Sequence, residues 1–516
     1  MDPGNSGLQG QSGAVKLVDK TPPAAFRLAY GARAQIRGLT IAQRVQRVAL
    51  LREIILGERE NIIDDIQRET GKSRGDALMS EIYPTLRHLE YLETQSVLFL
   101  SDKKTTPDAK AGDKEAWLVR EPLGTVLIIA PWSYPFLHAM SYCMSSFVCG
   151  NATIFKPSEH TPLHGIMERF LAQAGFQSDW IQVVYGGATL GKLLIEESPN
   201  KIFFSGSAAT GKRVMAQAAS ALIPVNLALG GKDPMIIFED AHLPRAAVAA
   251  AWGAFTNAGQ HCSSIERILI HHSVYDAFKA EFLKQVNQLR LGIDVDGDTD
   301  FGKMTTSFQV TLIRSQVEEA RVQGARFLTG EDWNGVDRLI PPIVIEGTNP
   351  TMRVVTEETF GPVVTLHPFR TEQEALSVAN RSDYGLAASV WTADVERAHR
   401  VAKLIQTGNV SINNVMLTER NPGLPFGGAK QSGFGRIHGE AGFDAFSNAK
   451  TIAFDSSQAA NEPYWYPYTR KKYELFSDVL VTYFQKGMAG MMQYWKARKV
   501  LTQYCRELDK SGRGEE

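Results

Sequence analysis

The spacing of hydrophobic positions follows a helical period near the start of the chain and a strand pattern further on. Between Thr40 and Leu100, charged residues separate aliphatic ones that recur at helical spacing. Such spacing predicts amphipathic helices, because residues three or four apart share one face. The aliphatic positions are Leu50, Leu51, Ile54, Ile55, Ile62 and Ile63. A polar linker follows Lys103, and the pattern changes after it.

Runs of consecutive hydrophobic residues then predict strands that are buried on both faces. The clearest run is Gly124–Ala130, and continuous hydrophobicity is typical of parallel sheets that helices cover on both sides. Similar runs alternate with helix-like segments, at Ala152–Phe155, Ile181–Tyr185, Lys201–Phe204 and Val225–Leu229. This alternation predicts a doubly wound, Rossmann-like parallel sheet. A second α/β series begins near Pro234–Phe238 and runs to about Phe446, so the predicted fold class is α/β.

The last segment, Pro463–Glu516, differs in composition from the rest. It is rich in aromatic and basic residues, and its hydrophobic positions fall at helical spacing, which predicts a helical tail with one apolar face. Gly487 and Gly490 would weaken a helix there by roughly 1 kcal/mol each relative to alanine. The positions on the predicted face are Tyr473, Phe476, Leu480, Phe484, Met488, Met491 and Trp495.

Length, charge and cysteine content limit the class of protein. With 516 residues the chain is long for one hydrophobic core, which predicts two or three domains. A formal net charge of -1 argues against nucleic acid as an obligate partner. Four cysteines in so long a chain do not make a disulfide framework, so we expect a reducing, cytoplasmic environment.

The sequence predicts neither a membrane span nor a structured start. No stretch reaches the roughly 18 uninterrupted apolar residues that a spanning helix needs. The nearest candidate, Leu475–Met492, contains Asp478 and Lys486. Residues 1–20 begin with a segment rich in Gly, Ser and Gln that lacks an apolar core, so they are expected to be a disordered lead-in rather than a signal peptide or anchor.

Cys262 is the strongest candidate for chemistry. A lone cysteine is usually a small buried hydrophobe, but this one ends the segment Asn257–Cys262 (NAGQHC). Gly259 lets the backbone approach a ligand closely, and the Gln260 amide can hold the loop. A thiolate at this position can form a thiohemiacetal with an aldehyde, from which hydride passes to nicotinamide. A charged His261 would lower the thiol pKa, although sequence neighbours often point apart.

The Cys262 segment resembles the nucleophile loop of the aldehyde dehydrogenase superfamily. Six further blocks of that superfamily occur in the same order, within roughly Gly31–Ser456. One block alone is weak, but seven in register are specific. The six blocks are Pro131–Phe136 (PWSYPF), Lys156–Glu159 (KPSE), Phe204–Ser207 (FSGS), Leu229–Lys232 (LGGK), Glu358–Pro362 (ETFGP) and Pro425–Gly428 (PFGG).

The resemblance implies a dinucleotide cofactor and the residues that bind it. Lys156 and Glu159 would bind the adenosine ribose, and Glu358 the nicotinamide ribose. Glu159 opposes a ribose 2′-phosphate by its charge, so NAD is favoured and NADP is the alternative. No metal site is expected. The implied cofactor-binding residues are Pro131, Trp132, Lys156, Ser158, Glu159, Gly206, Ser207, Leu229, Gly230, Glu358 and Phe360.

A glycine-serine pair supports the cofactor assignment from the residues themselves. Gly206 and Ser207 follow the predicted strand Lys201–Phe204, with Gly211 further on, and would place amides and a hydroxyl at a helix N-terminus. A pyrophosphate is favoured there by N–H groups without helical partners and by the helix dipole. The usual G-x-G-x-x-G spacing is absent, and a simple helix cap is the alternative interpretation.

Two positions depart from the superfamily pattern, and both belong to the implied catalytic machinery. Ala228 stands where hydrolytic members carry a glutamate that activates water. Alanine accepts no proton, so general-base catalysis worth about 10²–10⁴-fold should be lost there. Ser133 stands where an asparagine amide commonly donates to the oxyanion, a contact worth about 10²–10³-fold. The Cys262 backbone N–H would remain as a second donor.

Several hypotheses about these departures stay open. Deacylation is slow, leaving a long-lived acyl-enzyme, or another carboxylate such as Glu357 or Glu358 serves as base. Coenzyme A replaces water as acceptor, as in acylating relatives that lack the glutamate. Ala228 was engineered to trap an intermediate. A rival from another class is a catalytically silent scaffold that keeps the fold.

The resemblance also sets the expected domain boundaries. Exposed strands at Trp117–Arg120 and Thr451–Phe454 are expected to pair, and an exposed strand edge is a liability that a neighbouring subunit resolves, which predicts a homodimer or a dimer of dimers. The expected domains are an NAD(P)-binding domain (21–102 and 122–234), a catalytic domain (235–446), an oligomerisation arm (103–121 and 447–460) and a C-terminal helical extension (461–516).

The tail has two possible partners and bears on the substrate. It packs on its own or a neighbouring subunit, or its basic residues bring the apolar face to an anionic membrane surface. Its position resembles that of the tails of fatty-aldehyde enzymes, so we expect an oxidoreductase that acts on an apolar or long-chain aldehyde. The basic residues are Arg470, Lys471, Lys472, Lys496, Arg498 and Lys499.

Overall fold

The computed structural model describes residues 21–105, 114–456 and 461–511. The predicted lead-in, residues 1–20, lies outside the described residues. The chain forms two compact units, the first built from the chain up to Asp102 together with Val119–Lys450, the second from Lys103–Leu118 together with Thr451–Glu516. The further division of the first unit into cofactor-binding and catalytic domains stays a prediction.

Helices precede the first buried strand, as the periodicity between Thr40 and Leu100 predicts. The helix over Ile41–Gly57 begins with a capping box, in which the Thr40 hydroxyl accepts from the Gln43 N–H and the Gln43 side chain accepts from the Thr40 N–H. The elements are α1 (Pro22–Gly38), α2 (Ile41–Gly57), α3 (Arg59–Thr70), α4 (Arg74–Ala77), a π-helical turn η1 (Leu78–Ile82) and α5 (Tyr83–Leu100).

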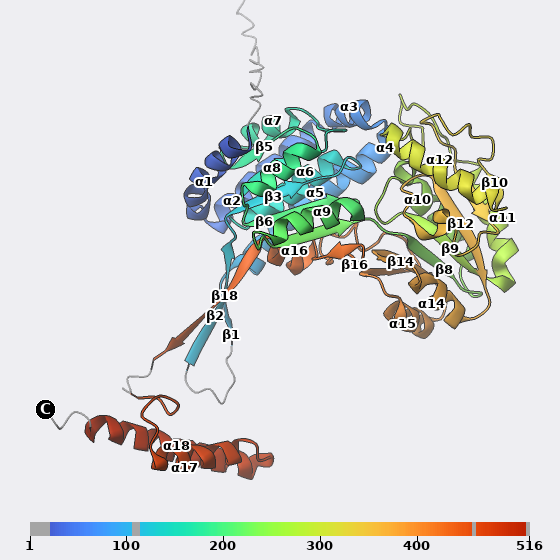
Figure 1. The fold of residues 1–516 in the computed structure, drawn as a ribbon. Coiled ribbons are helices and arrows are strands. Elements are labelled where there is room, and N and C mark those ends of the chain that lie inside the picture. The colour runs from blue at the N-terminus through green and yellow to red at the C-terminus, as the bar shows by residue number, and fades with distance from the viewer. Residues whose placement is uncertain (1–20, 106–113, 457–460, 512–516) are drawn as a thin grey trace, which may run out of the picture. The chain divides into compact units, whose positions relative to one another are not determined.

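A six-stranded sheet follows, in the order β17-β7-β6-β3-β4-β5 (Figure 1). All neighbours are parallel except β17, which pairs antiparallel with β7. The chain runs outward from β3 to β5 and returns beside β3 at β6, so a topological switch point lies between β3 and β6. The strands are β3 (Thr125–Ile129), β4 (Ala152–Lys156), β5 (Ile181–Val183), β6 (Lys201–Gly206), β7 (Val225–Leu229) and β17 (Gly433–Phe434).

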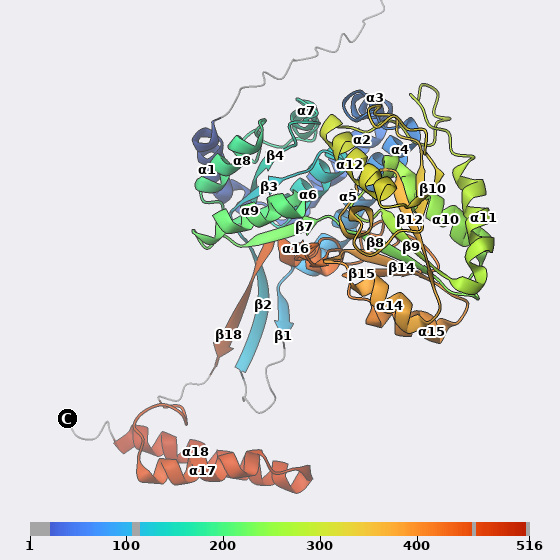
Figure 2. The same cartoon turned by 45° about the vertical axis from the view of Figure 1, so that its right-hand side comes forward.

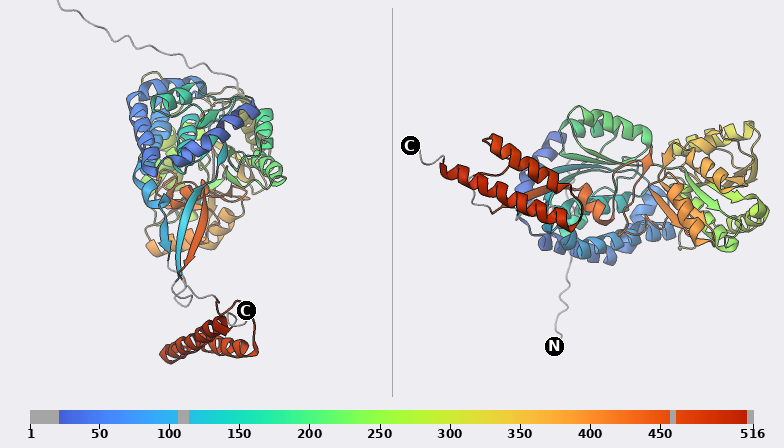
Figure 3. Two further views of the ribbon diagram at one scale, coloured as in Figure 1. Left: turned by 90° about the vertical axis from the view of Figure 1, so that its left-hand side faces the viewer. Right: turned by 90° about the horizontal axis from the view of Figure 1, so that it is seen from below.

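Helices cover both faces of this sheet. On one face, α8 contacts both α1 and α9. On the other face, α6 packs on β4, and α2 and α5 pack on α6. In the right-hand view of Figure 3, α9, in green, lies on one side of the sheet and blue helices lie on the other. The covering helices are α6 (Pro135–Val148), α7 (Ile166–Gln173), α8 (Ala188–Glu196) and α9 (Ala208–Ala219).

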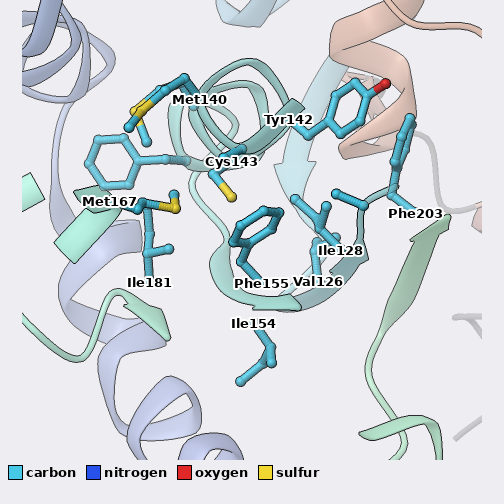
Figure 4. Packing of buried hydrophobic residues seen from close by; sticks show 14 of the residues in the cluster. Val126, Ile128, Met140, Tyr142, Cys143, Ile154, Phe155, Met167, Ile181 and Phe203 are labelled. Carbon is cyan, nitrogen blue, oxygen red and sulfur yellow. The ribbon is translucent and has the colours of Figure 1, made fainter. Parts of the chain in front are cut away.

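The core of the first sheet forms where α6 meets β3 and β4. Figure 4 shows Cys143 of α6 among Phe155 of β4 and the β3 side chains Val126 and Ile128. These residues are fully or almost fully buried. Because both faces of β3 are buried, its sequence is a continuous hydrophobic run. A strand with one face in water would instead alternate hydrophobic and polar residues.

The two sheets of the first unit are joined directly. β7 ends at Leu229 and β8 begins at Asp233, so only residues 230–232 link them. The carboxyl end of one parallel sheet therefore meets the amino end of the next. Side chains would not fit at this link, because a Cβ on Gly230 would lie 1.8 Å from Glu358 Oε1 and one on Gly231 would lie 2.8 Å from the Cys262 carbonyl oxygen.

The second sheet has the order β10-β11-β12-β9-β8-β14-β15 (Figure 2), and only β10 runs antiparallel to its neighbour. One hydrophobic cluster joins it to α10, α11 and α12, and another joins it to α14 and α15. The strands are β8 (Asp233–Ile237), β9 (Ile265–His271), β10 (Arg326–Thr329), β11 (Ile343–Glu346), β12 (Val363–Phe369), β14 (Ala387–Trp391) and β15 (Asn409–Ile412).

The remaining elements of the first unit are short or lie over the second sheet. They are α10 (Leu243–Phe255), η3 (Thr256–Gly259), η4 (His272–Val274), α11 (Tyr275–Val286), α12 (Ser307–Val322), α13 (Arg353–Thr356), β13 (Tyr384–Gly385), α14 (Glu372–Asn380), α15 (Val395–Leu404), β16 (Ala429–Lys430) and α16 (Gly439–Ala445).

A three-stranded sheet, β1-β2-β18, contains the two strands that were expected to pair. β2 (Lys114–Pro122) lies between β1 (Lys103–Thr105) and β18 (Ser447–Asp455), which leaves β18 at an edge. Ile452 and Phe454 of β18 are 46% and 54% exposed.

The tail forms two helices where the sequence predicted one continuous face. α17 (Arg470–Tyr483) ends before Gly487, which adopts φ 86°, and α18 (Gly487–Ser511) begins there. The chain turns back between Phe484 and Gly487, so α17 and α18 contact each other. Tyr494, Leu501 and Cys505 are buried instead of the predicted face, whose members are all exposed. Among the described residues, no helix is long and apolar enough to span a bilayer.

The loop before Cys262 holds an unusual backbone. Asn257, Ala258 and Gly259 all have positive φ, at 52°, 55° and 67°. Buried Asp76 fixes the start of this turn by accepting from Thr256 Oγ1 (2.9 Å) and from the Asn257 N–H (3.0 Å). The strain of consecutive left-handed residues, roughly 1–2 kcal/mol for each one other than glycine, is therefore offset by buried hydrogen bonds.

The end of the turn is fixed by a side-chain amide and a glycine. Gln260 Oε1 accepts from the Thr305 N–H at 2.8 Å, and its Nε2 donates to the Asn257 carbonyl at 2.9 Å. A Cβ on Gly259 would lie 2.2 Å from the Gly361 carbonyl oxygen. The sequence prediction that Gly259 allows a close approach and that Gln260 holds the loop therefore has a structural basis, although the approach is to backbone.

We expect Gly259→Ala to destabilise the protein much more than Gly175→Ala. Both glycines have positive φ (67° and 74°), but nothing lies within 4 Å of a Cβ at Gly175. The control should lose about 1–2 kcal/mol from the backbone conformation alone. The Gly259 variant should lose at least about 1–3 kcal/mol more from the forced shift of packed backbone. Urea denaturation measures both, and equal losses would contradict the close approach.

Candidate active site

One cavity of about 790 Å³ gathers the residues that the sequence assigned to catalysis or to cofactor binding. It lies at the carboxyl ends of β3, β4, β6 and β7, on both sides of the topological switch point, where ligands bind in open α/β sheets. The predicted residues that line it are Pro131, Trp132, Ser133, Lys156, Ser158, Glu159, Gly206, Ser207, Ala228, Leu229, Gly230, Cys262, Glu358 and Phe360.

At one side of the cavity, Lys156 and Glu159 form an ion pair. Lys156 Nζ lies 3.4 Å from Glu159 Oε2, and Nζ also donates to the Pro157 carbonyl. Burial lowers the pKa of the lysine, and the charge of Glu159 opposes that shift. Burial raises the pKa of the glutamate, but its own backbone N–H and Lys156 outweigh this, so its pKa is lowered. Glu159 therefore presents a negative charge to the cavity.

The helix α9 starts directly at the cavity. Ser207 is its N-cap, with extended backbone, and its hydroxyl accepts from the Thr210 N–H. A Cβ on Gly211 would lie 2.8 Å from Leu229 Cδ2, so this glycine allows the helix to pack closely against β7. The first N–H groups of a twelve-residue helix thus face a cavity wall, which suits a pyrophosphate.

Aromatic rings form another wall. Trp132 packs edge to face on Phe360 with centroids 5.3 Å apart, and on Phe308 at 6.1 Å. The Thr161 hydroxyl holds the Trp132 carbonyl at 3.0 Å. Phe360 itself has φ 50°, a conformation that buried hydrogen bonds must hold.

A buried ion pair supplies those hydrogen bonds. The Glu266 carboxylate accepts from the Thr359 N–H at 2.9 and 3.1 Å and from the Phe360 N–H at 3.0 Å. Lys232 pairs with the same carboxylate and donates to Thr359 Oγ1 at 3.0 Å. Lys232 and Glu266 are almost completely buried, so the pair positions the segment around Glu358 rather than facing ligand.

Glu358 lies over the link between the two sheets. Its carboxyl occupies the space beside Gly230 and accepts from the Gly231 N–H. Burial, followed by the charge of Glu266, raises its pKa to about 8, and Lys232 only partly offsets this. At neutral pH the group is therefore largely a neutral acid that can both donate and accept at a ribose hydroxyl.

Ser133 is placed by a buried lysine. Lys72 Nζ donates to the Ser133 carbonyl and lies 2.9 Å from Glu81 Oε1. Glu81 in turn accepts from the Phe136 N–H at 2.8 Å and the Leu137 N–H at 3.2 Å at the start of α6. Ser133 is buried at the cavity wall. Ser133 and Cys262 line the same cavity, which is a requirement for the predicted oxyanion donor.

Cys262 is surrounded by carboxyl groups. Its Sγ lies 3.9 Å from Glu419 Oε1, and the Ser263 hydroxyl donates to Glu419 Oε2 at 2.5 Å. Burial raises the pKa of the thiol well above its usual value, and the charges of Glu419, Asp233 and Glu358 raise it further. Cys262 at rest is therefore a protonated thiol that must lose its proton before it can attack.

The structure corrects the hypothesis that His261 lowers the thiol pKa. Burial lowers the pKa of His261, more strongly than the charge of Glu419 raises it. The ring is thus neutral at pH 7 and supplies no cation. Its Nε2 instead lies 3.4 Å from Glu419 Oε2, and its Nδ1 accepts from the Ser263 N–H at 3.2 Å.

Sequence reasoning missed several of these residues. Glu419 belongs to none of the seven blocks, and its contact with Cys262 joins positions 157 residues apart. Asp76 and Lys72 act on the loop and on Ser133 from the N-terminal helices. Without an alignment the only signal was their charge, and most charged residues are on the surface.

His261, Cys262 and Glu419 lie close together, with one side-chain nitrogen, sulfur or oxygen atom from each within 4.8 Å of the others.

We expect Glu358→Gln to alter the pH dependence of stability. The carboxyl pKa is about 8 in the folded chain and about 4.3 in an unfolded one. The folded state therefore keeps a proton that the unfolded state loses, and stability falls as the pH rises through this window. Glutamine has no proton to lose, so the variant should be more stable than the wild type at pH 9, by about 1 kcal/mol or more, but not at pH 5. Urea denaturation at both values tests this, and an equal difference at both would contradict it.

Comparison with known proteins agrees with this geometry. A family model described as the aldehyde dehydrogenase family matches residues 15–452. The 4,4'-diapolycopene aldehyde oxidase of Methylomonas sp is 37% identical over 474 residues, which cover 91% of this chain and 88% of that protein. A betaine aldehyde dehydrogenase of Cereibacter sphaeroides is 34% identical over 445 residues, covering 85% and 90%.

Solved structures give the same result. The betaine aldehyde dehydrogenase of Staphylococcus aureus, in complex with NAD+, has a TM-score of 0.79 at 31% identity and covers 85% of this chain and 88% of its own. The NAD-dependent aldehyde dehydrogenase of Sinorhizobium meliloti has a TM-score of 0.81 at 30% identity, covering 85% and 88%. With its cavity, its Cys262 loop and these likenesses together, the chain belongs to the aldehyde dehydrogenase family.

Proposed function

We propose that this protein oxidises an apolar aldehyde with NAD+, through a thiohemiacetal and then a thioester on Cys262. The observation that supports this best is the placement of Cys262 in one cavity with Ser133 and with the start of α9. The family supports NAD(P)-dependent aldehyde oxidation in general. The residue roles, the preference for NAD and the class of aldehyde are the proposal.

The cavity suits a dinucleotide. The α9 N-terminus and Ser207 would hold the pyrophosphate, Lys156 and Glu159 the adenosine ribose, and Glu358 the nicotinamide ribose. A nicotinamide ring bound there supplies the acceptor for the aldehyde's hydride. Because Glu159 faces the cavity as an anion, a 2′-phosphate would be repelled, which favours NAD over NADP. Equal equilibrium affinity for the two cofactors would contradict this preference.

The chain's own groups carry out the reaction on the aldehyde. Cys262 Sγ attacks the carbonyl carbon, and the Cys262 backbone N–H with the Ser133 hydroxyl would stabilise the oxygen. Ala228 lines the same cavity and offers no proton acceptor to the water that releases the acid. The release step therefore depends on another group, or on a thiol such as coenzyme A as acceptor.

A smaller cavity beside Cys262 suggests an apolar substrate. It has a volume of about 70 Å³ and shares His138, Tyr142, Glu419 and Ile437 with the larger one. Its apolar lining residues are Met79, Pro84, Leu137, Trp252, Met416, Pro422 and Ile437. Trp252 and Met79 are partly exposed at 37% and 49%, as expected of an entrance that an apolar chain would use.

Two surfaces outside the first unit support proposals on assembly. The exposed edge of β18 suits pairing with a neighbouring subunit, as in a homodimer or a dimer of dimers. On the tail, exposed Phe484, Met488 and Trp495 accompany Arg498, which stacks on Trp495 at 5.2 Å. This surface suits either a neighbouring subunit or an anionic membrane surface. Light scattering and liposome flotation of the full chain distinguish the two.

The reaction itself is tested with decanal and NAD+. The wild-type protein should form NADH in a burst of one equivalent per active site, and Cys262→Ala should form none. Cys143→Ala is the matched control, because Cys143 is buried in the core away from the cavity. If the burst is followed by slow turnover that coenzyme A accelerates, acylation of coenzyme A is the physiological reaction. Absence of any burst from the wild type would mean a silent scaffold.

The substrate class is tested by comparing decanal with betaine aldehyde. A buried methylene contributes about 0.8 kcal/mol, so kcat/KM should rise about threefold to fourfold for each methylene added from butanal onward, until the cavity is filled. Betaine aldehyde has no alkyl chain comparable to that of decanal to bury, so its kcat/KM should be lower. A higher kcat/KM for betaine aldehyde than for decanal would contradict the apolar assignment.

A further inference from the structure

Ala228 provides no side-chain base, so the reaction needs another proton acceptor in the cavity. The Cys262 thiol is protonated at rest, because burial raises its pKa. Its proton must go to some acceptor during attack, and the water that cleaves the thioester must lose a proton as well. Ala228 on β7 accepts none. Any replacement must be a group that can hold a negative charge and reach the sulfur.

Three carboxyl groups influence Cys262, and two of them are unsuited. Burial raises the pKa of Asp233 well above its ordinary value, so it stays a neutral acid. Its Oδ1 accepts from the Ala387 N–H at 3.1 Å, beneath the Gly231 backbone. Glu358, with a pKa of about 8, is also largely protonated at pH 7.

Glu419 differs in geometry. Its Oε1 contacts Cys262 Sγ at 3.9 Å, a distance that a thiol hydrogen bond to oxygen can span. A water attacking the carbonyl carbon bonded to Sγ would lie in the same space. The carboxylate is 21% exposed and lines the cavity, so it is open to solvent.

The other carboxylate oxygen is anchored. Ser263 Oγ donates to Glu419 Oε2 at 2.5 Å. The Ser263 N–H donates to His261 Nδ1, which places the imidazole proton on Nε2, and Nε2 lies 3.4 Å from the same Oε2. The Ser263 hydroxyl thus holds Oε2, with the imidazole close to the same oxygen, while Oε1 faces the sulfur. A carboxylate that is anchored in this way is positioned to act as a general base.

We propose that Glu419 is the proton acceptor of this active site, in place of the side chain that Ala228 lacks, with Ser263 and His261 positioning it. The inference rests on the proposed function, because it assigns the proton acceptor of the same Cys262 chemistry. It replaces the earlier hypotheses that Glu357 or Glu358 serves as base. The proposal also explains why the Glu419 carboxylate lies next to Cys262. Without a role as proton acceptor, its negative charge would only oppose formation of the thiolate.

The steps balance with any acyl donor. Glu419 takes the thiol proton as the Sγ–C bond forms, and the donor's leaving group departs with its electron pair. Glu419 then releases that proton to solvent. In the second step it takes a proton from water as the water oxygen bonds to the acyl carbon. The C–S bond breaks, and the thiolate takes the proton back from Glu419, which restores the resting site and releases the acid.

An ester probe tests this without cofactor and without knowledge of the natural aldehyde. p-Nitrophenyl acetate should acylate Cys262 in a burst of nitrophenolate and then turn over in a steady phase limited by deacylation. Glu419→Gln should slow both phases, each by about 10²–10⁴-fold. Glu396→Gln, an exposed carboxylate on α15, is the matched control and should leave both phases unchanged.

Two further experiments distinguish the loss of a general base from structural damage to the active site. Glu419→Asp keeps a carboxylate and should retain both phases much better than the glutamine variant. Hydroxylamine attacks thioesters without a general base, so it should accelerate the steady phase of Glu419→Gln more than that of the wild type. Either phase of Glu419→Gln within twofold of the wild type, equal losses in the Asp and Gln variants, or no gain with hydroxylamine would each overturn the assignment.

The test also separates this inference from the proposed function. A wild type that forms NADH from decanal, while Glu419→Gln hydrolyses the ester normally, would leave aldehyde oxidation standing and remove Glu419 from it. A wild type with no Cys262-dependent ester burst would overturn both the nucleophile assignment and the inference.

Discussion

The two glycines that link the sheets allow Glu358 and the Cys262 backbone to lie against the same short segment. Gly230 and Gly231 connect β7 to β8 without side chains, and the space this leaves is filled by the Glu358 carboxyl on one side and the Cys262 backbone on the other. A larger residue at either position would displace one of them. The groups proposed to hold the nicotinamide ribose and to attack the aldehyde are therefore brought together by packing against the same short segment.

Around that link, buried ionic groups hold backbone rather than substrate. Asp76 fixes the left-handed turn before Cys262, Glu266 with Lys232 fixes the segment after Glu358, and Lys72 with Glu81 fixes Ser133. Buried charges are costly unless they are fully paired. Their concentration here fits a site whose strained loops must be held in one conformation. The same burial raises the pKa of Cys262, which is why a nearby proton acceptor matters.

Much of the fold could be predicted from sequence because its strands are buried on both faces. The runs at β3, β4, β6 and β7 were found within one or two residues of their observed ends. The family blocks also identified the residues that line the main cavity. What could not be predicted depends on long-range contacts. Glu419 reaches Cys262 only after β15 and the loop that follows it fold back. The spacing of hydrophobic residues along the chain does not predict such a contact.

Two other differences have local causes. The tail pattern predicted one apolar face, but the chain turns back between α17 and α18, and Tyr494 and Leu501 are buried while Phe484 and Met488 are exposed. The hypothesis of a cation at His261 fails because burial lowers the pKa of the imidazole. In both cases the sequence identifies the residues, but their burial depends on contacts with distant parts of the chain that the sequence alone does not give.

In the proposed reaction, Cys262 attacks an aldehyde carbon and carries the acyl group afterwards. This is tested by the mass of the protein quenched in acid immediately after mixing with decanal and NAD+, followed by peptide mapping. We expect a protein heavier by one decanoyl group, located on the peptide that contains Cys262. An unmodified Cys262 peptide at a time when one equivalent of NADH has formed would contradict it.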